Sequence, residues 1–191
     1  MASLRADAVR NRDRLLTAAA ELFTDRGVDV PLDEVARRAG VSIGTLYNHF
    51  PNRGALLDAV LPERMAEMGR LAEAALAEPD SWKGFTGFLM GLFAVMAGDR
   101  ALNDAIARSP IGPVDIAAEC GQSGGVLADM LQRAQAAGAL RHDFGTPDLA
   151  TVIWAMSKVI AMADGDDTVW RRHLGFILDG LRARGPEGSG A

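Results

Sequence analysis

The sequence predicts an all-α fold. Apolar residues recur three and four positions apart in nearly every segment of the 191-residue chain, which is the spacing of an amphipathic helix. Glycine, proline and short polar residues separate these segments and supply helix start and stop signals. No segment shows the alternating, β-branched pattern that is typical of a strand. We therefore expect about nine helices, with small ones first and larger, more apolar ones later.

The first three helices are expected over residues 10–26, 32–39 and 43–49. Gly27 stops the first helix, and Pro31 suits the first turn of the second because its ring fixes a helical φ. Gly40 supplies the turn before the third helix, since glycine takes the positive φ of a tight interhelical turn. Ser42 then caps the third helix by accepting from a free backbone N–H group.

A long helix is expected over about residues 53–77, following Asn52 as N-cap. Pro62 lies inside it and either kinks the helix or marks a boundary. The sequence TPD at residues 146–148 is a strong start signal for a later helix. Together with that one, the remaining helices are expected over about residues 81–96, 100–108, 114–137, 146–163 and 167–184.

Composition excludes several classes of protein. No apolar run approaches the roughly 20 residues that span a bilayer, and the N-terminus has no apolar signal-peptide core. Cys120 is the only cysteine, so an internal disulfide is excluded and a reducing compartment fits best. We expect a soluble cytoplasmic protein.

The net charge of −5 does not by itself favour nucleic acid as a partner. Residues 1–53 carry eight arginines against seven acidic residues, so the rest of the chain holds the whole negative excess. The N-terminal region is therefore less acidic than the rest without being basic, and charge alone does not identify its partner.

Residues 32–50, LDEVARRAGVSIGTLYNHF, fit a helix-turn-helix unit. Ala36 is small and permits a close crossing of two helices, Gly40 makes the turn, and Leu46 packs back between the helices. In this motif the second helix enters the major groove of DNA with its N-terminal residues nearest the base edges.

Polar side chains crowd the second helix of this unit, within VSIGTLYNHF at residues 41–50. Two interpretations are open, a solvated face and a surface that binds a nucleic-acid groove. Arg53 favours the interpretation as a surface that binds a nucleic-acid groove. A cation in the first turn of a helix is disfavoured by roughly 0.3–1 kcal/mol, and a docked phosphate resolves that conflict.

The stretch GVSIGTLYNHFPNRGALLDAV, with the preceding helix that ends in LFTDRG, resembles the DNA-binding domain of TetR/AcrR-family transcriptional regulators. The resemblance implies a helix-turn-helix domain over residues 9–60, with the motif at about 31–50, and a ligand-binding and dimerisation domain over 61–184. Residues 185–191 are too polar and small to pack and are expected to be disordered. Carried over by position, the residues that face DNA are Ser42, Ile43, Gly44, Thr45, Tyr47, Asn48, His49 and Arg53.

The start of the second helix departs from the family. Members often carry a threonine pair that caps this helix and contacts phosphate, whereas Pro31 and Leu32 stand here, followed by Asp33. Phosphate contacts from this helix are expected to be weaker. Arg37 and Arg38 are candidates to replace them, against the alternative of plain helix surface. An N-terminal arm that reaches phosphate, or a frayed terminus, would contain Arg5, Arg10, Arg12 and Arg14.

In the C-terminal region, residues 82–96 are apolar on most sides, which is typical of a buried helix. Ordinary core and the lining of a ligand pocket both fit, and the resemblance favours a cavity in the domain as a whole. Trp154 fits either the pocket or a dimer contact. The candidate pocket residues are Phe85, Phe88, Leu89, Leu92, Phe93, Met96 and Trp154.

Two features of the later helices bear on assembly and binding. Residues 146–163 and 167–184 are the pair that the resemblance assigns to the homodimer contact. Three glycines in the helix before them cost roughly 0.5–1 kcal/mol each, and they indicate a break, a close helix approach or room for a ligand. The sequence does not choose a role for Gly121, Gly124 and Gly125.

No catalytic or metal site is expected. The three histidines, His49, His142 and His173, show no ligand spacing, and no glycine-rich phosphate loop follows a strand. Asp115 and Glu119 lie one helical turn apart, but a solvated pair explains them better than a cation site. No cofactor is expected.

The resemblance and the helix pair together imply a dimeric transcriptional regulator, a repressor that a partly apolar small molecule releases from a near-palindromic operator. The alternative is a helical small-molecule-binding protein whose helix-turn-helix no longer binds DNA, given Asp33 and the missing threonines. The operator sequence and the identity of the effector are not encoded in a form that the sequence reveals.

Overall fold

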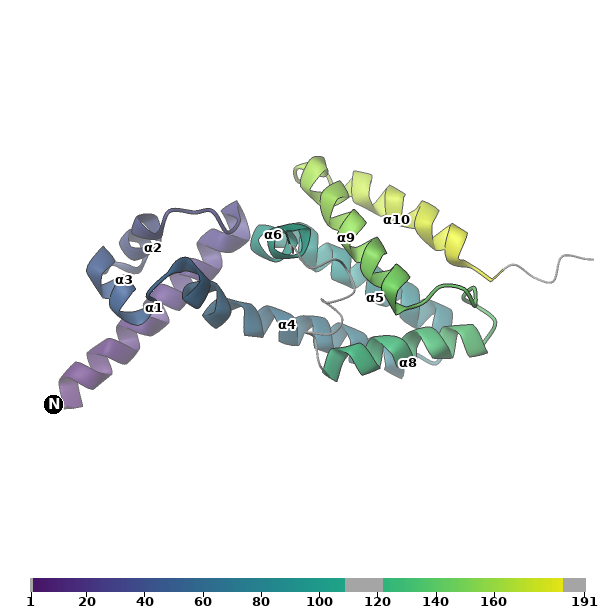
Figure 1. The fold of residues 1–191 in the computed structure, drawn as a ribbon, viewed down its shortest axis with the longest axis horizontal. Helices are drawn as coiled ribbons and strands as arrows, with labels where there is room; N and C mark the ends of the chain where they lie inside the picture. The colour runs from purple at the N-terminus through teal and green to yellow at the C-terminus, as the bar shows by residue number, and fades with distance from the viewer. Residues whose placement is uncertain (1, 109–121, 184–191) are drawn as a thin grey trace, which may run out of the picture. The chain divides into compact units, whose positions relative to one another are not determined.

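The computed structural model describes residues 2–108 and 122–183, and nearly all of these residues are helical (Figure 1). The chain divides into two compact units. The N-terminal unit comprises Met1–Ala66 and Gly98–Ala105, and the C-terminal unit comprises Glu67–Ala97 and Ile106–Ala191. The predicted all-α class is confirmed.

Four helices build most of the N-terminal unit. These are α1 (Ala2–Arg26), α2 (Leu32–Ala39), α3 (Ile43–His49) and the first half of α4 (Arg53–Ala77). The predicted bounds of α2, α3 and α4 are confirmed. The first helix is longer than predicted, because α1 begins at Ala2 rather than at residue 10, so a frayed N-terminal segment is not observed there.

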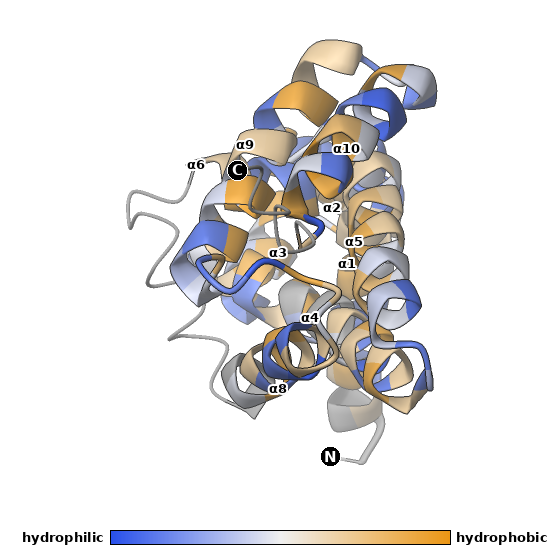
Figure 2. Ribbon diagram, turned by 90° about the vertical axis from the view of Figure 1, so that its right-hand side faces the viewer, coloured by the Kyte–Doolittle hydropathy of each residue, from blue (hydrophilic) through white to orange (hydrophobic). Residues whose placement is uncertain are grey.

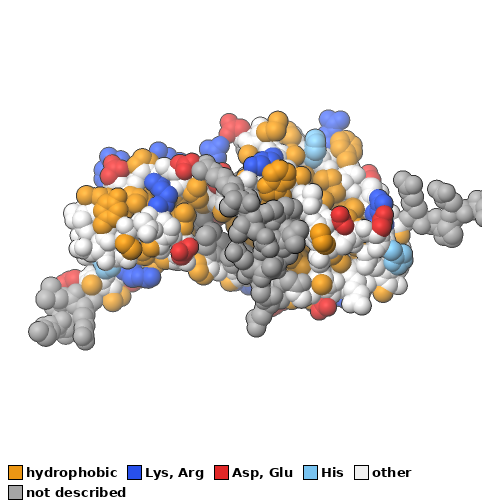
Figure 3. Space-filling model, in the orientation of Figure 1, with side chains coloured by type: hydrophobic (Ala, Val, Ile, Leu, Met, Phe, Trp, Pro, Cys, Tyr) orange, Lys and Arg blue, Asp and Glu red, His pale blue; other side chains and the backbone are white. Residues whose placement is uncertain are grey.

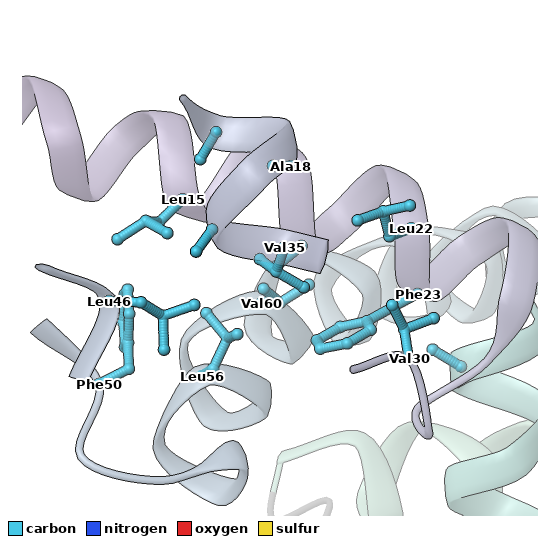
Figure 4. Packing of buried hydrophobic residues seen from close by; sticks show 14 residues of the cluster. Leu15, Ala18, Leu22, Phe23, Val30, Val35, Leu46, Phe50, Leu56 and Val60 are labelled. Carbon is cyan, nitrogen blue, oxygen red and sulfur yellow. The ribbon is translucent and has the colours of Figure 1, made fainter. Parts of the chain in front are cut away.

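The core of the N-terminal unit lies where α1 crosses the other three helices. Leu15, Phe23, Leu46 and Leu56 are fully buried and point toward one another (Figure 4). Burial of each such side chain contributes roughly 1.5–3 kcal/mol. Ala101 joins the same cluster, which explains why Gly98–Ala105 belongs to this unit. This core fixes α3 rigidly against α1.

The C-terminal unit holds the apolar helices. Its elements include α5 (Ser81–Gly98), α8 (Gln122–Ala136), α9 (Thr146–Ala163) and α10 (Asp167–Leu181). α6 (Arg100–Arg108), like α4, contributes residues to both units. Hydrophobic residues run along most of α5, whereas α10 alternates between hydrophobic and hydrophilic (Figure 2).

The last helix ends before its predicted limit. α10 stops at Leu181 because Arg182 leaves helical geometry and pairs with Leu140 in an isolated antiparallel bridge. The N–H groups of Arg141 and Ala183 donate across this bridge to the carbonyls of Leu181 and Ala139 at 3.0 Å. The prediction that this helix reaches residue 184 is therefore wrong, since a tertiary contact ends it.

Two other predictions meet the structure in part. α4 continues through Pro62 as one helix, and the division between the units falls four residues later. Of the predicted helix over residues 114–137, the structure describes α8 from Gln122, and residues 114–121 lie outside the described part. Among the described helices none is by itself long and apolar enough to cross a membrane, although α5 and α6, joined at a sharp bend, pass that test together.

Candidate nucleic-acid interface

A tight turn joins α2 to α3. Gly40 adopts the left-handed conformation, with φ 65° and ψ 37°, which a side chain with a Cβ rarely takes. The N–H of Gly40 donates to the carbonyl of Arg37 at 3.1 Å, and the N–H of Val41 donates to that of Ala36 at 3.0 Å. These bonds satisfy the last carbonyls of α2 and redirect the chain, so the helix-turn-helix predicted from Ala36, Gly40 and Leu46 is present.

Ser42 sets the start of α3. Its Oγ accepts from the backbone N–H of Thr45 at 3.2 Å and lies 2.9 Å from the Oγ1 of Thr45. The predicted cap is confirmed. Because the two hydroxyls bond to each other, the Thr45 side chain is held in a fixed rotamer at the beginning of the helix.

The outer face of α3 is exposed although it carries large side chains. Ile43 is 41% exposed and Tyr47, one turn later, is 49% exposed, and Asn48 is exposed as well. On the inner face, Leu46 and Phe50 are buried in the core. Isoleucine and tyrosine on a short helix that is anchored so firmly form a surface suited to contact another molecule.

Arg53 has partners within the chain that sequence reasoning did not identify. Its Nη1 donates to the carbonyl of Val30 at 2.7 Å and also to that of Val28. The side chain thus ties the α1–α2 connection to the start of α4. These carbonyl oxygens offset the unfavourable placement of a cation at this helix end. The sequence had suggested a docked phosphate for that role. No local sequence signal marks them, because they lie more than 20 positions away.

α2 begins with no side-chain cap, as its departure from the threonine pair predicts. Pro31 occupies the N-cap position, and Asp33 is exposed in the first turn. Both candidate replacement arginines meet carboxylates. The Arg38 Nη2 lies 2.7 Å from the Glu21 Oε2, and the Arg37 Nη2 lies 3.8 Å from the Glu34 Oε1.

Two family models match this chain. The model for bacterial regulatory proteins of the tetR family matches residues 15–60, and the model for the C-terminal domain of SbtR-like transcriptional regulators matches residues 80–183. The crystal structure of a TetR transcription regulatory protein from Mycobacterium vanbaalenii is 32% identical in sequence. That similarity covers 94% of this chain and 99% of the other, with a TM-score of 0.55. The chain belongs to the TetR family of transcriptional regulators.

Two curated regulators differ in how much of them is matched. An HTH-type transcriptional regulator of Mycobacterium tuberculosis is 29% identical over 174 residues, which cover 88% of this chain and 90% of that protein. The regulator TtgW of Pseudomonas putida is 45% identical over 60 residues, which cover 31% of this chain and 45% of TtgW. The chain therefore matches less than half the length of TtgW, and the higher identity is confined to one part of the sequence.

In this TetR-family protein, most candidate pocket residues lie in the core. Along α5 they are fully or almost fully buried, and Phe85 makes an edge-on contact with Phe144 at 6.4 Å between ring centroids. Trp154 differs, since it is 39% exposed and the Lys158 Nζ lies 5.4 Å from its ring centroid. The buried set on α5 comprises Phe85, Phe88, Leu89, Leu92, Phe93 and Met96.

The two C-terminal helices of this TetR-family protein expose apolar side chains. Met162 on α9 is 86% exposed, and Phe176 on α10 is 60% exposed. Val169 and Trp154 on the same two helices are each 39% exposed. α9 and α10 pack against each other, so these side chains lie on a surface that their mutual contact leaves uncovered.

Some of the other candidate residues lie outside the described part of the chain. These are Asp115, Glu119, Cys120 and Gly121. Gly124 and Gly125 lie in the first turn of α8, and a Cβ at Gly125 would meet no atom within 4 Å. Within the described residues, no group of three or more histidine, cysteine, aspartate or glutamate side chains could hold a metal ion.

Proposed function

We propose that this TetR-family protein is a dimeric repressor that binds a near-palindromic operator and is released from it by a small molecule. The observation that carries the proposal is the exposed face of α3. Ile43, Tyr47 and Asn48 stand outward from a helix that Leu46 and Phe50 anchor in the core. A helix held in this way can enter a major groove without reorganising.

The side chains around α3 divide into two roles. Ser42, Tyr47, His49 and Arg53 would contact phosphates and fix the register of the protein on the duplex. Thr45, Asn48 and Ile43 would bias the choice of base through hydrogen bonds and apolar contact at base edges. Gly44 faces open space, since a Cβ there would have only Ser42 Oγ nearby, at 3.9 Å. Because glycine has no side chain, the helix could approach the DNA backbone closely at this position.

The exposed apolar side chains of α9 and α10 support dimerisation. A symmetric dimer through this helix pair covers Met162, Val169 and Phe176 with their counterparts and forms an isologous four-helix contact. The two copies of α3 would then occupy successive major grooves about 34 Å apart, which requires an operator of near-palindromic sequence. A DNA-binding role agrees with the cytoplasmic location expected from the sequence.

The effector is expected to be partly apolar. α5 supplies a continuous apolar wall of aromatic, leucine and methionine side chains to the C-terminal unit. α4 and α6 each contribute residues to both units, so a change in either helix in one unit reaches the other through covalent continuity. By linkage, operator DNA must weaken effector binding by the factor by which the effector weakens DNA binding.

Binding of labelled duplexes by α3 variants tests the proposal. We expect Tyr47→Ala to weaken binding to every duplex, because a phosphate contact carries no sequence information. Asn48→Ala should mainly change the preferred sequence, with a loss of about 1–3 kcal/mol in discrimination at one base pair. Lys83→Ala, an exposed change on α5, is the matched control and should change neither property. Equal binding by all variants would exclude α3 as the interface.

A second candidate is a helical small-molecule-binding protein without DNA binding. The exposed Asp33 at the start of α2 favours it, because a carboxylate there repels a phosphate backbone. Salt dependence separates the two candidates. DNA affinity that falls steeply with salt supports the repressor, whereas no affinity for duplexes at low salt supports the alternative.

A further inference from the structure

Four arginines of the N-terminal unit, Arg10, Arg26, Arg37 and Arg38, face carboxylates. Arg26 lies 2.5 Å from Glu34, and Arg38 lies 2.7 Å from Glu21. Arg10 pairs with Asp7, which precedes it by one helical turn. On the face shown in Figure 3, blue and red side chains are accordingly interspersed rather than gathered into one basic surface. These pairs add little net positive potential for a phosphate backbone.

α2 adds none. In a helix-turn-helix the first helix of the motif crosses the DNA backbone, so its N-terminal end is normally a phosphate contact. Here that end carries the exposed Asp33, and the nearby Glu34 holds both Arg26 and Arg37. The two acidic residues at the start of α2 oppose the phosphate contact that this end of the helix would otherwise make.

Arg12 and Arg14 of α1 are different. Both are exposed, and within the described residues neither guanidinium lies within ion-pair distance of a carboxylate. The Arg12 Cζ lies 5.4 Å from the ring centroid of Phe50, at the end of α3. The Arg14 Nη2 lies 3.4 Å from the carbonyl of Gly40, at the turn that precedes α3.

The two arginines therefore flank the proposed recognition helix, one at each end. The helix backbone that carries them is anchored, because Leu15, which follows Arg14, is fully buried against the same core as Leu46. The Arg14 guanidinium lies so close over the turn that a Cβ at Gly40 would be 2.3 Å from its Nη2. A guanidinium held in place has donors suited to two phosphate oxygens and loses less entropy when it binds them.

We propose that Arg12 and Arg14 bind the DNA phosphates beside the two ends of α3 and replace the backbone contact that α2 lacks. The proposal rests on the proposed function, since it names the phosphate-binding residues of that same interface. It adds two cationic contacts on α1, which lies outside the helix-turn-helix motif itself.

The slope of log affinity against log salt concentration tests it, measured with an operator-containing duplex and with a duplex of unrelated sequence. Each phosphate contact contributes about 0.9 to the slope, and a dimer carries each arginine twice. Arg12→Ala and Arg14→Ala should each lower the magnitude of the slope by about 2 and weaken both duplexes by the same factor. Arg12→Lys and Arg14→Lys should restore most of the slope, because the charge is kept.

Arg37→Ala is the matched control, since it removes the same charge from the same unit at a side chain that is 76% exposed. It should leave the slope unchanged. The proposal is overturned if the double Arg12→Ala, Arg14→Ala variant keeps the wild-type slope while its melting temperature is unchanged. A loss of slope in Arg37→Ala as large as in Arg12→Ala would overturn it too. Wild-type protein with no salt-dependent DNA binding would instead refute the proposed function, and this proposal with it.

Discussion

Gly84 lies where α5 passes close to the end of α4. A Cβ at this position would stand 2.4 Å from the carbonyl oxygen of Ala75, a backbone atom that cannot move aside. The side chain of Glu78 also lies close, at 3.4 Å. The absence of a side chain at Gly84 is therefore what permits the two helices to pack at this distance.

We predict that Gly84→Ala lowers the free energy of unfolding by about 1–3 kcal/mol through overpacking. Gly87→Ala is the matched control one turn along α5, where nothing lies within 4 Å, and it should stabilise by about 0.5–1 kcal/mol because alanine is the better helix former. Urea denaturation measures both. Equal stability of the two variants would show that α4 and α5 do not approach each other this closely at Gly84.

Arg53 has a structural role in the fold and a proposed role in DNA binding. Its removal leaves the carbonyls of Val28 and Val30 without their donor in a partly buried site. We predict that Arg53→Ala lowers the free energy of unfolding by about 1–3 kcal/mol as well as weakening DNA binding. Tyr47→Ala should weaken DNA binding alone. Thermal unfolding and duplex titration on the same samples distinguish these effects, and unchanged stability of Arg53→Ala would rule out the structural role.

Helix ends with a local signal could be predicted from the sequence. Ser42 caps α3 and Gly40 ends α2 through bonds to residues within five positions, so the spacing alone locates them. The same holds for α9, where Asp148 Oδ2 accepts from the N–H of Gly145 at 2.8 Å. Such contacts depend on neighbours along the chain, which the sequence displays directly.

Features that depend on distant residues could not be predicted. α10 ends at Leu181 because of a pairing with Leu140, some 40 positions earlier, and no residue near Arg182 signals it. The partners of Arg53 and the ion pair between Arg38 and Glu21 also join residues that are distant in sequence. The candidate site residues on α3 could be proposed from the sequence because one short helix carries them. Arg12 and Arg14 could be proposed only as part of an N-terminal arm, because their positions beside α3 depend on tertiary packing.

At the scale of an element, α10 begins with a charged cap. Asp166 Oδ1 accepts from the Oγ1 of Thr168 at 2.6 Å and from its backbone N–H at 2.9 Å, and these hydrogen bonds hold the pKa of Asp166 below its ordinary value. The side-chain bond to Trp170, followed by that to Arg171, likewise lowers the pKa of Asp167. Because the folded-state pKa is depressed, the stabilisation is present above the unfolded value of about 3.9 and is lost as pH falls through the folded value.

We predict that Asp166→Asn reduces this pH dependence. Asparagine caps a helix about as well as aspartate but does not titrate. The melting temperature of the wild type should therefore exceed that of the variant most clearly at pH 6, and the difference should shrink as pH falls below about 4. Differential scanning calorimetry from pH 3 to 6 measures this. A constant difference over that range would show that the carboxylate of Asp166 is not what lowers the acid stability.

At the scale of the whole molecule, the proposed dimer contact is the exposed apolar surface of α9 and α10. We predict that Phe176→Asp weakens self-association by roughly 100-fold or more, since each of the two copies would lose about 1.5–3 kcal/mol of aromatic burial at the proposed contact and would place a charge there. Val9→Asp is the control, because Val9 on α1 is 59% exposed and Phe176 is 60% exposed. Sedimentation velocity at several concentrations gives the association state. Dissociation caused by Val9→Asp, but not by Phe176→Asp, would place the dimer contact elsewhere.

A symmetric dimer that presents two copies of α3, as proposed, should bind one specific DNA sequence. Selection of bound duplexes from a random pool by the purified protein at moderate salt tests it most directly. We expect enrichment of a near-palindromic motif whose half-sites are about one helical turn apart, centre to centre. A folded dimeric protein that enriches no motif would contradict it.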